Sequence, residues 1–281
     1  MSSVSVLVLT KNEERDLPGC LNSVSWCDDV HVLDSGSTDG TCDIARRLGA
    51  SVVTRTYADS TKIFGGDEAA HRNWSLSNTA FRHPWVLLLD ADERVTEGLR
   101  AAILEAVKSP GSNVAFRIRR RDFLGNTWLK HVQAVPFYLR LFRPEKLRYE
   151  RFVNPVSIAD GPVGEVGGFL DHYPFSKGVS HWLERHNAYS SLEARQIVEN
   201  RRVFAKPSAY KALLAADSHE RRLHQKELFY RIPFRPLVKF CILYFGKRGL
   251  LDGRAGFEYA VLQAFYEYMI VLKVRESQGM S

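Results

Sequence analysis

The first hundred residues alternate short apolar runs with helical patterns, and no other feature restricts the fold of this chain as strongly. Runs rich in β-forming residues cover residues 4–9, 30–34, 51–55 and 85–90. Helical patterns lie between them, at residues 13–24, 41–48 and 69–80. A further helix is expected after Thr96, which can cap it. Strands that alternate with helices predict a parallel sheet covered on both faces, and such sheets bind ligands beyond the carboxyl ends of their strands.

The alternation ends at about residue 110, and the remaining chain is of a different kind. Two β-rich runs predict mixed sheet, at residues 114–119 and 137–142. A long helix is expected from about residue 177 to residue 204. From about residue 209 the chain is expected to be helical, with breaks at residues 233–236 and 246–253. The sequence therefore predicts an α/β domain followed by a helical extension.

Composition indicates a folded protein of a reducing compartment. Of the 281 residues 45% are hydrophobic, which is enough for a large core and excludes a disordered or fibrous chain. The four cysteines form no C-x-x-C pair, so neither a zinc knuckle nor a disulfide scaffold is indicated. Residues 4–9 are too few for a secretory signal, and no run reaches the roughly 18 apolar residues of a membrane span. We expect a cytoplasmic protein, soluble or attached to a surface.

Charge is unevenly distributed along the chain. Residues 1–114 carry 11 lysines and arginines against 16 acidic residues, whereas residues 115–151 carry 10 against 3 and residues 219–254 carry 9 against 3. A protein that binds nucleic acid rarely has an acidic first domain, and no nucleic-acid-binding motif is present. We therefore expect no nucleic-acid partner. Anionic lipid head groups or a phosphorylated substrate suit the two basic segments.

Polar residues follow three of the predicted strands directly. They are TKNEE at residues 10–14, DSGSTDGT at residues 34–41 and DADE at residues 90–93. In the last segment an apolar strand delivers Asp90 and Asp92 to its tip, and side chains two apart in an extended chain point the same way. Such close carboxylates repel unless a cation or a proton relieves them, so we expect Mg²⁺ or Mn²⁺ there. The alternative is helix capping with an ion pair to Arg94.

Taken together, the three segments resemble the nucleotide-sugar domain of family 2 glycosyltransferases, which have the GT-A fold. Spacing and order agree over residues 3–108, and His71-Arg72-Asn73 resembles the family's Arg-Asn segment beside the nucleotide. The resemblance implies an α/β, Rossmann-like GT-A fold: a mostly parallel central sheet with helices on both faces, plus a C-terminal helical extension. It also implies a nucleotide-sugar-binding half at residues 1–110, an acceptor-binding half at 111–205 and a helical region at 206–281.

The resemblance further implies roles for individual residues. Seven of them would contact the nucleotide sugar, expected to be a UDP-sugar: Thr10, Asn12, Glu13, Asp34, Asp39, Arg72 and Asp90. Asp92, with Asp90 nearby, would hold a metal that bridges the two phosphates, and His172 lies where GT-A enzymes can supply a third ligand. A metal acting as a Lewis acid stabilises the charge that develops when the sugar–diphosphate bond breaks. For His172, ordinary packing is the alternative.

The second half of the chain resembles a narrower bacterial group that includes lipopolysaccharide-core glucosyltransferases. The similar segments are HYPFSKG at residues 172–178, Trp182, His186-Asn187, Tyr189-Ser190 and GLLDG at residues 249–253. Members usually carry Val-His-Glu where this chain reads Val153-Asn154-Pro155, and proline cannot accept a proton. An inverting transfer needs a base within hydrogen-bond reach of the acceptor hydroxyl. Asp122, Glu150 and Asp160 are the nearby acids, and each could equally be an ion-pair partner of the arginines around it.

Cations interleave with aromatic residues between Arg221 and Arg254, as in segments that lie at a membrane surface. The helix expected at residues 257–272 contains Gln263 and Glu267 and is too polar to span a membrane. We expect peripheral contact with the inner face of the cell membrane, where a lipid-linked acceptor would lie. A helical hairpin packed on the first domain, with its basic residues solvated, is the alternative.

The expected function is an inverting, metal-dependent transfer of a hexose from a nucleoside-diphosphate sugar. The acceptor would be a glycan or a lipid-linked saccharide in bacterial surface polysaccharide or lipopolysaccharide synthesis. One alternative is a metal-dependent nucleotidyltransferase acting on sugar phosphates, but such enzymes usually carry a glycine-rich loop after the first strand, and residues 10–14 contain no glycine. The other is a non-catalytic basic binding module, which predicts that replacing Asp92 leaves function intact.

Overall fold

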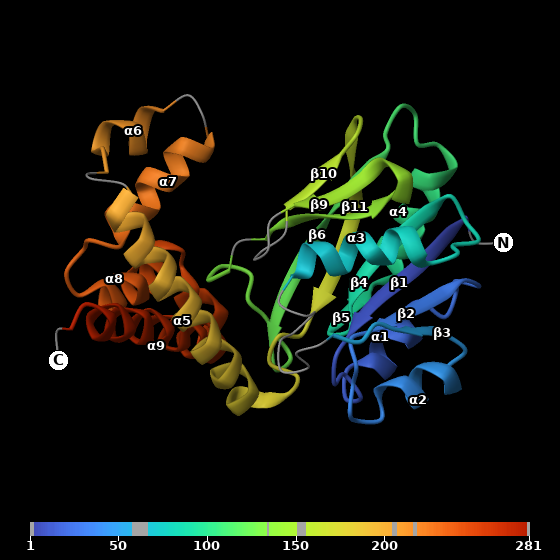
Figure 1. The fold of residues 1–281 in the computed structure, drawn as a ribbon, viewed down its shortest axis with the longest axis horizontal. Coiled ribbons are helices and arrows are strands. Elements are labelled where there is room, and N and C mark those ends of the chain that lie inside the picture. Colours follow the sequence, from blue (N-terminus) through green and yellow to red (C-terminus); the bar gives the residue numbers. More distant parts are fainter. Residues whose placement is uncertain are drawn as a thin grey trace. The chain divides into compact units, whose positions relative to one another are not determined.

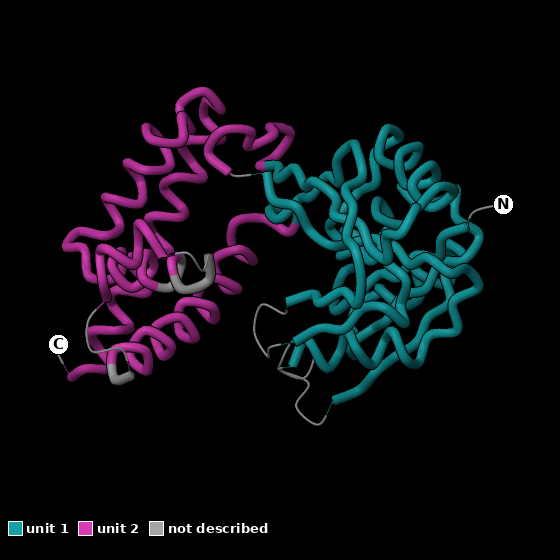
Figure 2. The backbone as a smooth tube through the Cα atoms, turned by 90° about the horizontal axis from the view of Figure 1, so that it is seen from above, with its two compact units in different colours: residues 1–123, 135–176 teal, residues 124–134, 177–281 magenta. Residues whose placement is uncertain are grey.

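The computed structural model describes residues 3–57, 67–133, 135–150, 156–203, 207–215 and 218–279. The chain forms two compact units (Figure 2). Unit 1 comprises residues 1–123 and 135–176, and unit 2 comprises residues 124–134 and 177–281. The long helix that starts at residue 178 thus belongs to unit 2 in full, whereas the division expected from the sequence lies near residue 205.

Unit 1 contains the sheet and the helices that cover it. Its first elements are β1 (Val4–Thr10), α1 (Leu17–Ser23), β2 (Val30–Asp34), α2 (Thr41–Arg47), β3 (Ser51–Thr54), α3 (Glu68–Asn78), β4 (Trp85–Asp90), β5 (Glu93–Val95) and α4 (Glu97–Lys108). They are followed by β6 (Ala115–Leu124), β8 (Phe137–Phe142), the 3-10 helix η2 (Pro144–Lys146), β9 (Leu147–Glu150), β10 (Val156–Ala159) and β11 (Val163–His172). The alternation of strands and helices expected before residue 110 is confirmed. The strands β5, β9, β10 and β11 were not expected from the sequence.

The strands of the main sheet follow the order β3-β2-β1-β4-β8-β6-β11-β5 (Figure 1). β1 pairs in parallel with both β2 and β4, so that Leu9 lies opposite Leu33 on one side and Asp90 on the other. β8 is antiparallel to both of its neighbours, β4 and β6. Since two strands antiparallel to a third run in the same direction, β6 runs with β4. β11 is parallel to β6.

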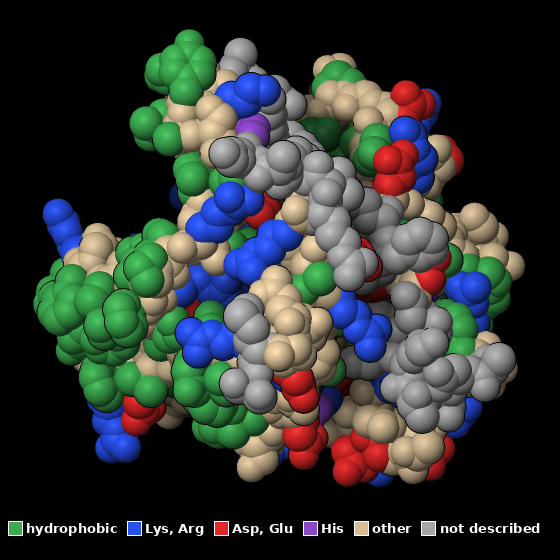
Figure 3. Space-filling model, turned by 60° about the vertical axis from the view of Figure 1, so that its left-hand side comes forward, with side chains coloured by type: hydrophobic (Ala, Val, Ile, Leu, Met, Phe, Trp, Pro, Cys, Tyr) green, Lys and Arg blue, Asp and Glu red, His purple; other side chains and the backbone are tan. Residues whose placement is uncertain are grey.

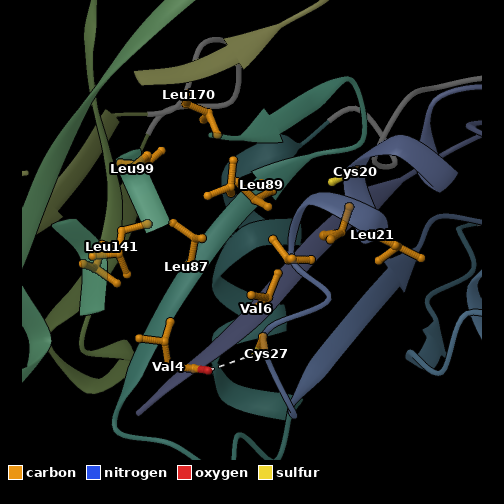
Figure 4. Packing of buried hydrophobic residues seen from close by; sticks show 14 of the residues in the cluster. Val4, Val6, Cys20, Leu21, Cys27, Leu87, Leu89, Leu99, Leu141 and Leu170 are labelled. Atoms are coloured by element: carbon orange, nitrogen blue, oxygen red, sulfur yellow. Dashed lines mark hydrogen bonds between the residues drawn. The ribbon is translucent and has the colours of Figure 1, made fainter. Parts of the chain in front are cut away.

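Helices cover both faces of this sheet, as the GT-A fold requires. Every residue of β1 is buried, which is typical of a central strand covered on both sides. Val6 belongs to the core cluster that includes Leu21 of α1 and Ile103 of α4, whereas Leu7 belongs to the cluster that includes Ala69 of α3. Figure 4 shows the first of these clusters. The expected fold class, α/β with a mostly parallel sheet and helices on both faces, is confirmed.

Unit 2 is helical, and this part of the expected fold is confirmed too. Its helices are α5 (Gly178–Val203), α6 (Ala209–Leu214), α7 (Ser218–Phe229), α8 (Arg235–Cys241), the π-helix η3 (Ile242–Gly246), the 3-10 helix η4 (Gly249–Asp252) and α9 (Gly253–Ser277). α8 and α9 begin at the two breaks expected from proline and glycine. No helix in the described part of the chain is long and apolar enough to cross a membrane.

The segments that resemble the narrower bacterial group hold unit 2 together. On α5, His186 stacks on Trp182 with ring centroids 3.5 Å apart. Lys273 of α9 donates hydrogen bonds to the Asn187 side-chain oxygen at 2.7 Å and to the Ser190 hydroxyl at 2.8 Å. These contacts join α5 to α9, so within unit 2 the resemblance is explained by packing.

Asp252 anchors the segment 124–134 to the other helices of unit 2. Its carboxylate accepts hydrogen bonds from the backbone N–H of His131 at 2.9 Å and of Val132 at 2.8 Å. It also lies 2.6 Å from Nδ1 of His131. The adjoining glycines allow a close backbone approach, because a Cβ on Gly256 would lie 2.0 Å from the carbonyl oxygen of Gly249.

Candidate active site

The carboxyl ends of five strands meet at one edge of the main sheet. β1, β2 and β4 are mutually parallel, and β6 and β11 run with them. Their last or nearly last residues are Thr10, Asp34, Asp90, Asp122 and His172. We call this edge the carboxyl edge. Since open α/β sheets bind ligands there, the structure places most of the expected site residues where a ligand would lie.

Asp34 organises the turn that follows β2. Its carboxylate accepts a hydrogen bond from the Thr10 hydroxyl at 3.0 Å, which ties the ends of β1 and β2 together. It also accepts from the backbone N–H of Gly36 at 2.9 Å and of Ser37 at 2.8 Å. The Ser37 hydroxyl adds a fourth hydrogen bond at 2.5 Å. Both oxygens of Asp34 are thus used within the protein, and its carboxylate fixes the shape of the loop.

The loops after β1 and β2 are joined by reciprocal hydrogen bonds. Asn12 adopts a left-handed conformation with φ 55°, which asparagine tolerates better than most residues. Its backbone N–H donates to the Ser37 hydroxyl at 2.8 Å, and its side-chain oxygen accepts from the N–H of Thr38 at 2.8 Å. The N–H of Glu13 donates to the Thr41 hydroxyl at 2.8 Å. These bonds hold the two loops as one preformed surface.

Asp39 extends this arrangement to the start of α2. Burial raises its pKa, but hydrogen bonds from the hydroxyl and N–H of Thr41 and from the N–H of Glu14 outweigh that effect and hold the pKa below its usual value. The Glu14 carboxylate in turn accepts from the N–H of Gly40 at 2.9 Å. Asp39 is therefore an ionised group that supports the loop.

Arg72 on α3 connects this helix to the end of β4. Its guanidinium donates to Glu68 at 2.5 Å and lies 3.5 Å from a carboxylate oxygen of Asp90. The ring of Tyr149 in β9 lies beside it, 5.4 Å from centroid to guanidinium carbon. Asn73 exchanges two hydrogen bonds with the backbone of Tyr149, both at 2.8 Å. The Arg-Asn segment therefore docks α3 on β9 and presents Arg72 to the carboxyl edge.

Asp90 and Asp92 have different partners, and the strand alternation from which a shared direction was expected does not extend to Asp92. The chain turns at Ala91 and Asp92 before β5 begins, and period-two alternation holds only in an extended chain. Asp90 accepts from Arg140 at 2.6 Å, and Glu93 accepts from the same guanidinium at 2.7 Å. Burial raises the pKa of Asp90, but Arg140 and Arg72 outweigh it and hold that pKa well below the usual range. Asp90 is thus an ion-pair partner.

Asp92 faces His172 instead. Nε2 of His172 lies 3.3 Å from a carboxylate oxygen of Asp92, and Nδ1 lies 2.6 Å from Asp122. Burial alone lowers the pKa of His172, but the charge of Asp92 and the hydrogen bonds to Asp122 and Asp92 outweigh it and raise this pKa to about 9. The three side chains come from β4–β5, β11 and β6, and they form one row at the carboxyl edge.

A second row of buried charges joins these residues to Arg72. Arg140 lies between Asp90 and Glu93, and Arg120 lies 3.7 Å from Glu93 and 3.0 Å from Asp122. Glu93 is fully buried, and burial together with the charge of Asp90 raises its pKa. Anions and cations alternate along the whole series. This arrangement compensates charges that would be unstable singly in a buried site.

Asp92 and His172 are the residues at this edge that fit a divalent cation. A histidine ligand usually donates its second ring N–H to a carboxylate, and Asp122 is placed to accept from Nδ1 while Nε2 faces Asp92. A carboxylate suits Mg²⁺ and Mn²⁺, and imidazole is a ligand of first-row divalent metals. Within the described residues no three His, Cys, Asp or Glu side chains gather as a metal site by themselves. With its pKa raised to about 9, His172 is protonated at neutral pH, so a cation would bind there by displacing the Nε2 proton and would take its remaining ligands from water and substrate oxygens.

The three acids considered as catalytic base lie in different surroundings. Asp122 is buried and engaged by His172 and Arg120. Glu150 is half-exposed, lies 3.1 Å from Nε of Arg148 and follows Tyr149 directly. Asp160 lies close to the amino end of β11 and 3.2 Å from Lys146, at the opposite edge of the sheet. The segment Val153-Asn154-Pro155 lies outside the described residues.

Arg140 and Arg120 were not expected at the site from the sequence. Arg140 interrupts the apolar run of β8 at a position 5% exposed, and a cation within such a run is a signal for a buried partner. Arg120 and Asp122 share a face of β6 because side chains alternate along a strand. Arg119, on the other face, lies over the ring of Phe137. Among Arg117, Arg119, Arg120 and Arg121 of β6, strand alternation therefore selects Arg120 as the one on the face of Asp122.

Comparison with known proteins decides the family. The model of glycosyl transferase family 2 matches residues 5–166, more than half of the chain. The chain belongs to glycosyl transferase family 2. The lipopolysaccharide core biosynthesis glycosyltransferase LpsC of Rhizobium meliloti is 26% identical to it, across 99% of this chain and 93% of that protein. The expected family is confirmed, and the matched range covers the main sheet as far as Val166 within β11, so that His172 lies beyond it.

Two solved structures are similar to this family 2 glycosyltransferase at low TM-scores. Residues 1–349 of S. aureus TarS match at a TM-score of 0.41 and 15% identity, covering 99% of this chain and 92% of that one. Glucosyl-3-phosphoglycerate synthase of Mycobacterium tuberculosis, solved with Mn²⁺, UDP and glucosyl-3-phosphoglycerate, matches at 0.35 and 23% identity, covering 43% and 44%. No residue role follows from similarities of this size.

Proposed function

We propose that this family 2 glycosyltransferase transfers a hexose from a UDP-sugar, with inversion, to a glycan or lipid-linked acceptor. The observation that carries the proposal is the row Asp92–His172–Asp122 at the carboxyl edge, beside Arg72 and its partner Asp90. Asp92 and His172 form a pair that fits a cation, and Arg72 lies at the same carboxyl edge, from which the loops after β1 and β2 extend. A nucleoside diphosphate needs these features, because its phosphates are anionic and its base requires a preformed loop surface.

In this proposal the expected nucleotide residues divide into two groups. Arg72 and the loop bearing Asn12 and Glu13 would contact the nucleotide directly. Thr10, Asp34, Asp39 and Asp90 would act by holding that loop and Arg72 in place, since their polar atoms are bonded within the protein. The group that touches the nucleotide is thus smaller than the group that shapes its site.

Asp92 and His172 would hold Mn²⁺ or Mg²⁺ in the proposed mechanism. When bound, the ion would neutralise charge on the diphosphate as it leaves the anomeric carbon. Asp122 would fix the ring of His172 through Nδ1, and the arginines behind it would compensate Asp122. The acceptor oxygen would form the new bond to the anomeric carbon as the bond to UDP breaks, and its proton would pass to a base.

Of the three candidates for that base, Glu150 has the most suitable surroundings. It follows Tyr149, which contacts Arg72, and its side chain is 52% exposed and therefore accessible to an acceptor. Glu150→Gln should lower kcat while binding of UDP stays unchanged. Asp160→Asn serves as the matched control, since Asp160 also pairs with an exposed cation but lies at the opposite edge. Equal loss in both variants would remove Glu150 from this role.

The experiment that tests the function is a panel of nucleotide sugars scored for hydrolysis with Mn²⁺, Mg²⁺ or chelator. We expect one UDP-sugar to be hydrolysed with metal, and the activity to be lost with chelator and in Asp92→Ala. Asp43→Ala is the matched control, because Asp43 is 88% exposed on α2. Activity that persists with chelator would contradict the metal role. Release of pyrophosphate from UTP and a sugar phosphate would instead identify a nucleotidyltransferase.

The proposed acceptor belongs to lipopolysaccharide or surface polysaccharide synthesis at the inner face of the cell membrane. The similarity to LpsC supports an acceptor from lipopolysaccharide synthesis. The surface of unit 2 supports a location at the membrane. Phe245 and Leu251 are each 58% exposed, within the segment that carries 9 cations against 3 acids. Figure 3 shows hydrophobic side chains gathered on one face with lysine and arginine side chains beside them. Such surfaces bind anionic membranes.

Flotation with anionic liposomes tests this contact. We expect the protein to float at low salt and to be released as salt rises. Phe245→Asp and Leu251→Asp should reduce flotation, whereas Leu213→Asp should not, because Leu213 lies on α6 outside the basic segment although it is 74% exposed. Absence of binding at low salt would exclude the membrane contact without affecting the proposed chemistry.

A further inference from the structure

Unit 2 contains a pocket of about 630 Å³ that plays no part in the proposed chemistry. All of its lining residues belong to unit 2, among them Arg201, Phe234, Arg235, Leu237, Val271 and Arg275. Most of the lining residues are apolar or aromatic. The volume lies in the range of pockets that bind small molecules, roughly 300–1,000 Å³. The pocket is therefore large enough for a ligand with hydrocarbon chains.

The charged residues of this pocket are all cations. Arg235 is buried and pairs with Glu267 at 2.9 Å, but Lys239 lies 3.8 Å from the same carboxylate. Glu267 therefore compensates the charge of Arg235, and the outer positive charge of the pocket comes from Arg201 and Arg275. Arg201, at the end of α5, donates to the carbonyl oxygen of Tyr230 at 3.3 Å, and Arg275 lies exposed near the end of α9. The walls are apolar and the charge is positive, a combination that favours an amphipathic anion.

Phe234 lies at the pocket in a conformation that its own side chain disfavours. Its φ is 54° and its ψ is 29°, the left-handed region in which a bulky residue is an outlier. Its side chain is nevertheless 81% exposed, and that of its neighbour Leu237 is 62% exposed. Burial within the protein therefore does not explain the strain. Strained residues often occur at ligand sites, where binding rather than folding stability maintains them.

We propose that this pocket binds an anionic membrane phospholipid. The acyl chains would pack on the apolar walls and against Phe234, and the phosphate would lie near Arg201 and Arg275. A membrane lipid is favoured because the pocket belongs to unit 2, whose exposed apolar side chains and basic segment support the proposed membrane contact. The inference rests on the proposed membrane contact and extends it from a surface to a defined lipid site.

Soluble lipids test the pocket without a membrane. The probe is dihexanoyl phosphatidylglycerol below its critical micelle concentration, titrated into the full chain by calorimetry. We expect saturable binding, and binding about tenfold or more weaker for dihexanoyl phosphatidylcholine, which has the same chains without net charge, and for glycerol 3-phosphate, which lacks the chains. Equal binding of phosphatidylcholine would overturn the anionic assignment. Equal binding of glycerol 3-phosphate would overturn the lipid assignment, and tighter binding of geranyl phosphate would indicate a lipid-linked acceptor instead.

Variants locate the binding. Val271→Trp fills the pocket, and Arg201→Gln with Arg275→Gln removes its outer cations, so each change should weaken phosphatidylglycerol binding about tenfold or more. Val261→Trp and Arg254→Gln are the matched controls, since both lie on α9 outside the lining. If the pocket variants bind like wild type, the proposal is overturned. A dimer in light scattering that excludes the lipid would assign the surface to a second copy and also overturn it.

Phe234→Gly separates binding from folding. Glycine adopts the left-handed conformation freely, and Phe234 contributes little buried area, so the melting temperature should rise. Binding of phosphatidylglycerol should weaken at the same time, because the aromatic wall is lost. A more stable variant that binds as tightly as wild type would remove Phe234 from the lipid site. Donor hydrolysis should be unchanged in all of these variants, so failure here is distinct from failure of the proposed chemistry.

Discussion

Nδ1 of His172 lies 2.6 Å from Asp122, while Nε2 of the same ring lies 3.3 Å from Asp92. Asp122 and His172 end two parallel strands, β6 and β11, whose register places these residues opposite each other. Asp92 reaches the ring from the turn between β4 and β5. Asp122, which was considered as the catalytic base, is therefore hydrogen-bonded to His172, which was considered as a metal ligand. Asp122 orients the His172 ring toward Asp92.

Asp122→Asn tests this positioning role. Asparagine keeps the shape but loses the charge that orients and polarises the ring, so metal affinity should fall about 10- to 100-fold, as for other partners of ligating histidines. Activity should recover at high Mn²⁺. Calorimetric Mn²⁺ binding and kcat as a function of metal concentration measure the two effects. If kcat falls at saturating Mn²⁺ while affinity is unchanged, Asp122 is the base and not a positioning residue.

Asp171→Asn is the control for this experiment. Asp171 precedes His172 on β11 and is also an ion-paired acid, bound by Arg121 at 2.6 and 2.9 Å. Its replacement should leave Mn²⁺ affinity within about twofold of wild type, since neighbouring side chains on a strand point to opposite faces and Asp171 therefore does not orient the His172 ring.

Arg140→Met should destabilise unit 1 by about 3–5 kcal/mol, because it leaves Asp90 and the fully buried Glu93 without their shared cation. Urea denaturation followed by circular dichroism measures the loss. Arg148→Met is the control: Arg148 is 60% exposed and paired with exposed Glu150, so less than about 1 kcal/mol should be lost. Adding Glu93→Gln to Arg140→Met should restore part of the stability. Equal losses in the two single variants would contradict the structural role of Arg140.

Asp29 should make folding stability depend on pH below about pH 4. Burial raises its pKa, but hydrogen bonds from Ser5 and from the N–H and side chain of Arg82 outweigh that and lower the pKa to about 2. Because the folded pKa lies below the unfolded value, the stabilisation of about 2 kcal/mol is present above pH 4. It should be about half lost by pH 3. The difference between wild type and Asp29→Asn in urea titrations should narrow accordingly, and a constant difference from pH 6 to pH 3 would contradict it.

Gly256→Ala should destabilise unit 2, because the added Cβ would lie 2.0 Å from the carbonyl oxygen of Gly249 and force η4 away from α9. Overpacking of this kind typically loses 1–3 kcal/mol or more. Gly98→Ala is the matched control in α4, where a Cβ meets nothing within 4 Å, and alanine should raise stability by roughly 0.5–1 kcal/mol. Thermal denaturation compares the two. A neutral Gly256→Ala would show that the close approach is not required.

The expectations that held depend on local chemistry. Hydrophobic runs and the polar turns after them predict β1, β2 and β4 and the segments that follow these strands. Strands that alternate with helices can bury their apolar faces in few ways, of which a parallel sheet covered by helices is the common one. The positions of α2 and α3 follow from periodicity to within one or two residues, and the start of α4 follows from capping, because Thr96 accepts a hydrogen bond from the N–H of Leu99 at 3.2 Å. These features can be predicted from residues that are neighbours in the sequence.

The ion pairs between residues distant in the sequence could not be predicted, because such pairs leave no local pattern. Arg140 is 50 residues from Asp90, and Asp122 is 50 residues from His172, so nothing near either residue reveals its partner. The strand β11 was missed because glycines interrupt its pattern, and with it the register that brings His172 to Asp122.

The amino-acid sequence by itself determined the family, the alternating sheet of unit 1 and the acids at the strand ends. Only the tertiary structure decided what those acids do: the turn after β4 directs Asp90 to Arg140 and Asp92 to His172. The reason is physical. Asp90 is neutralised by an arginine and Asp92 faces an imidazole because folding brings these side chains together from different strands of the sheet. Residues that are distant in the sequence come within bonding distance only in the folded chain.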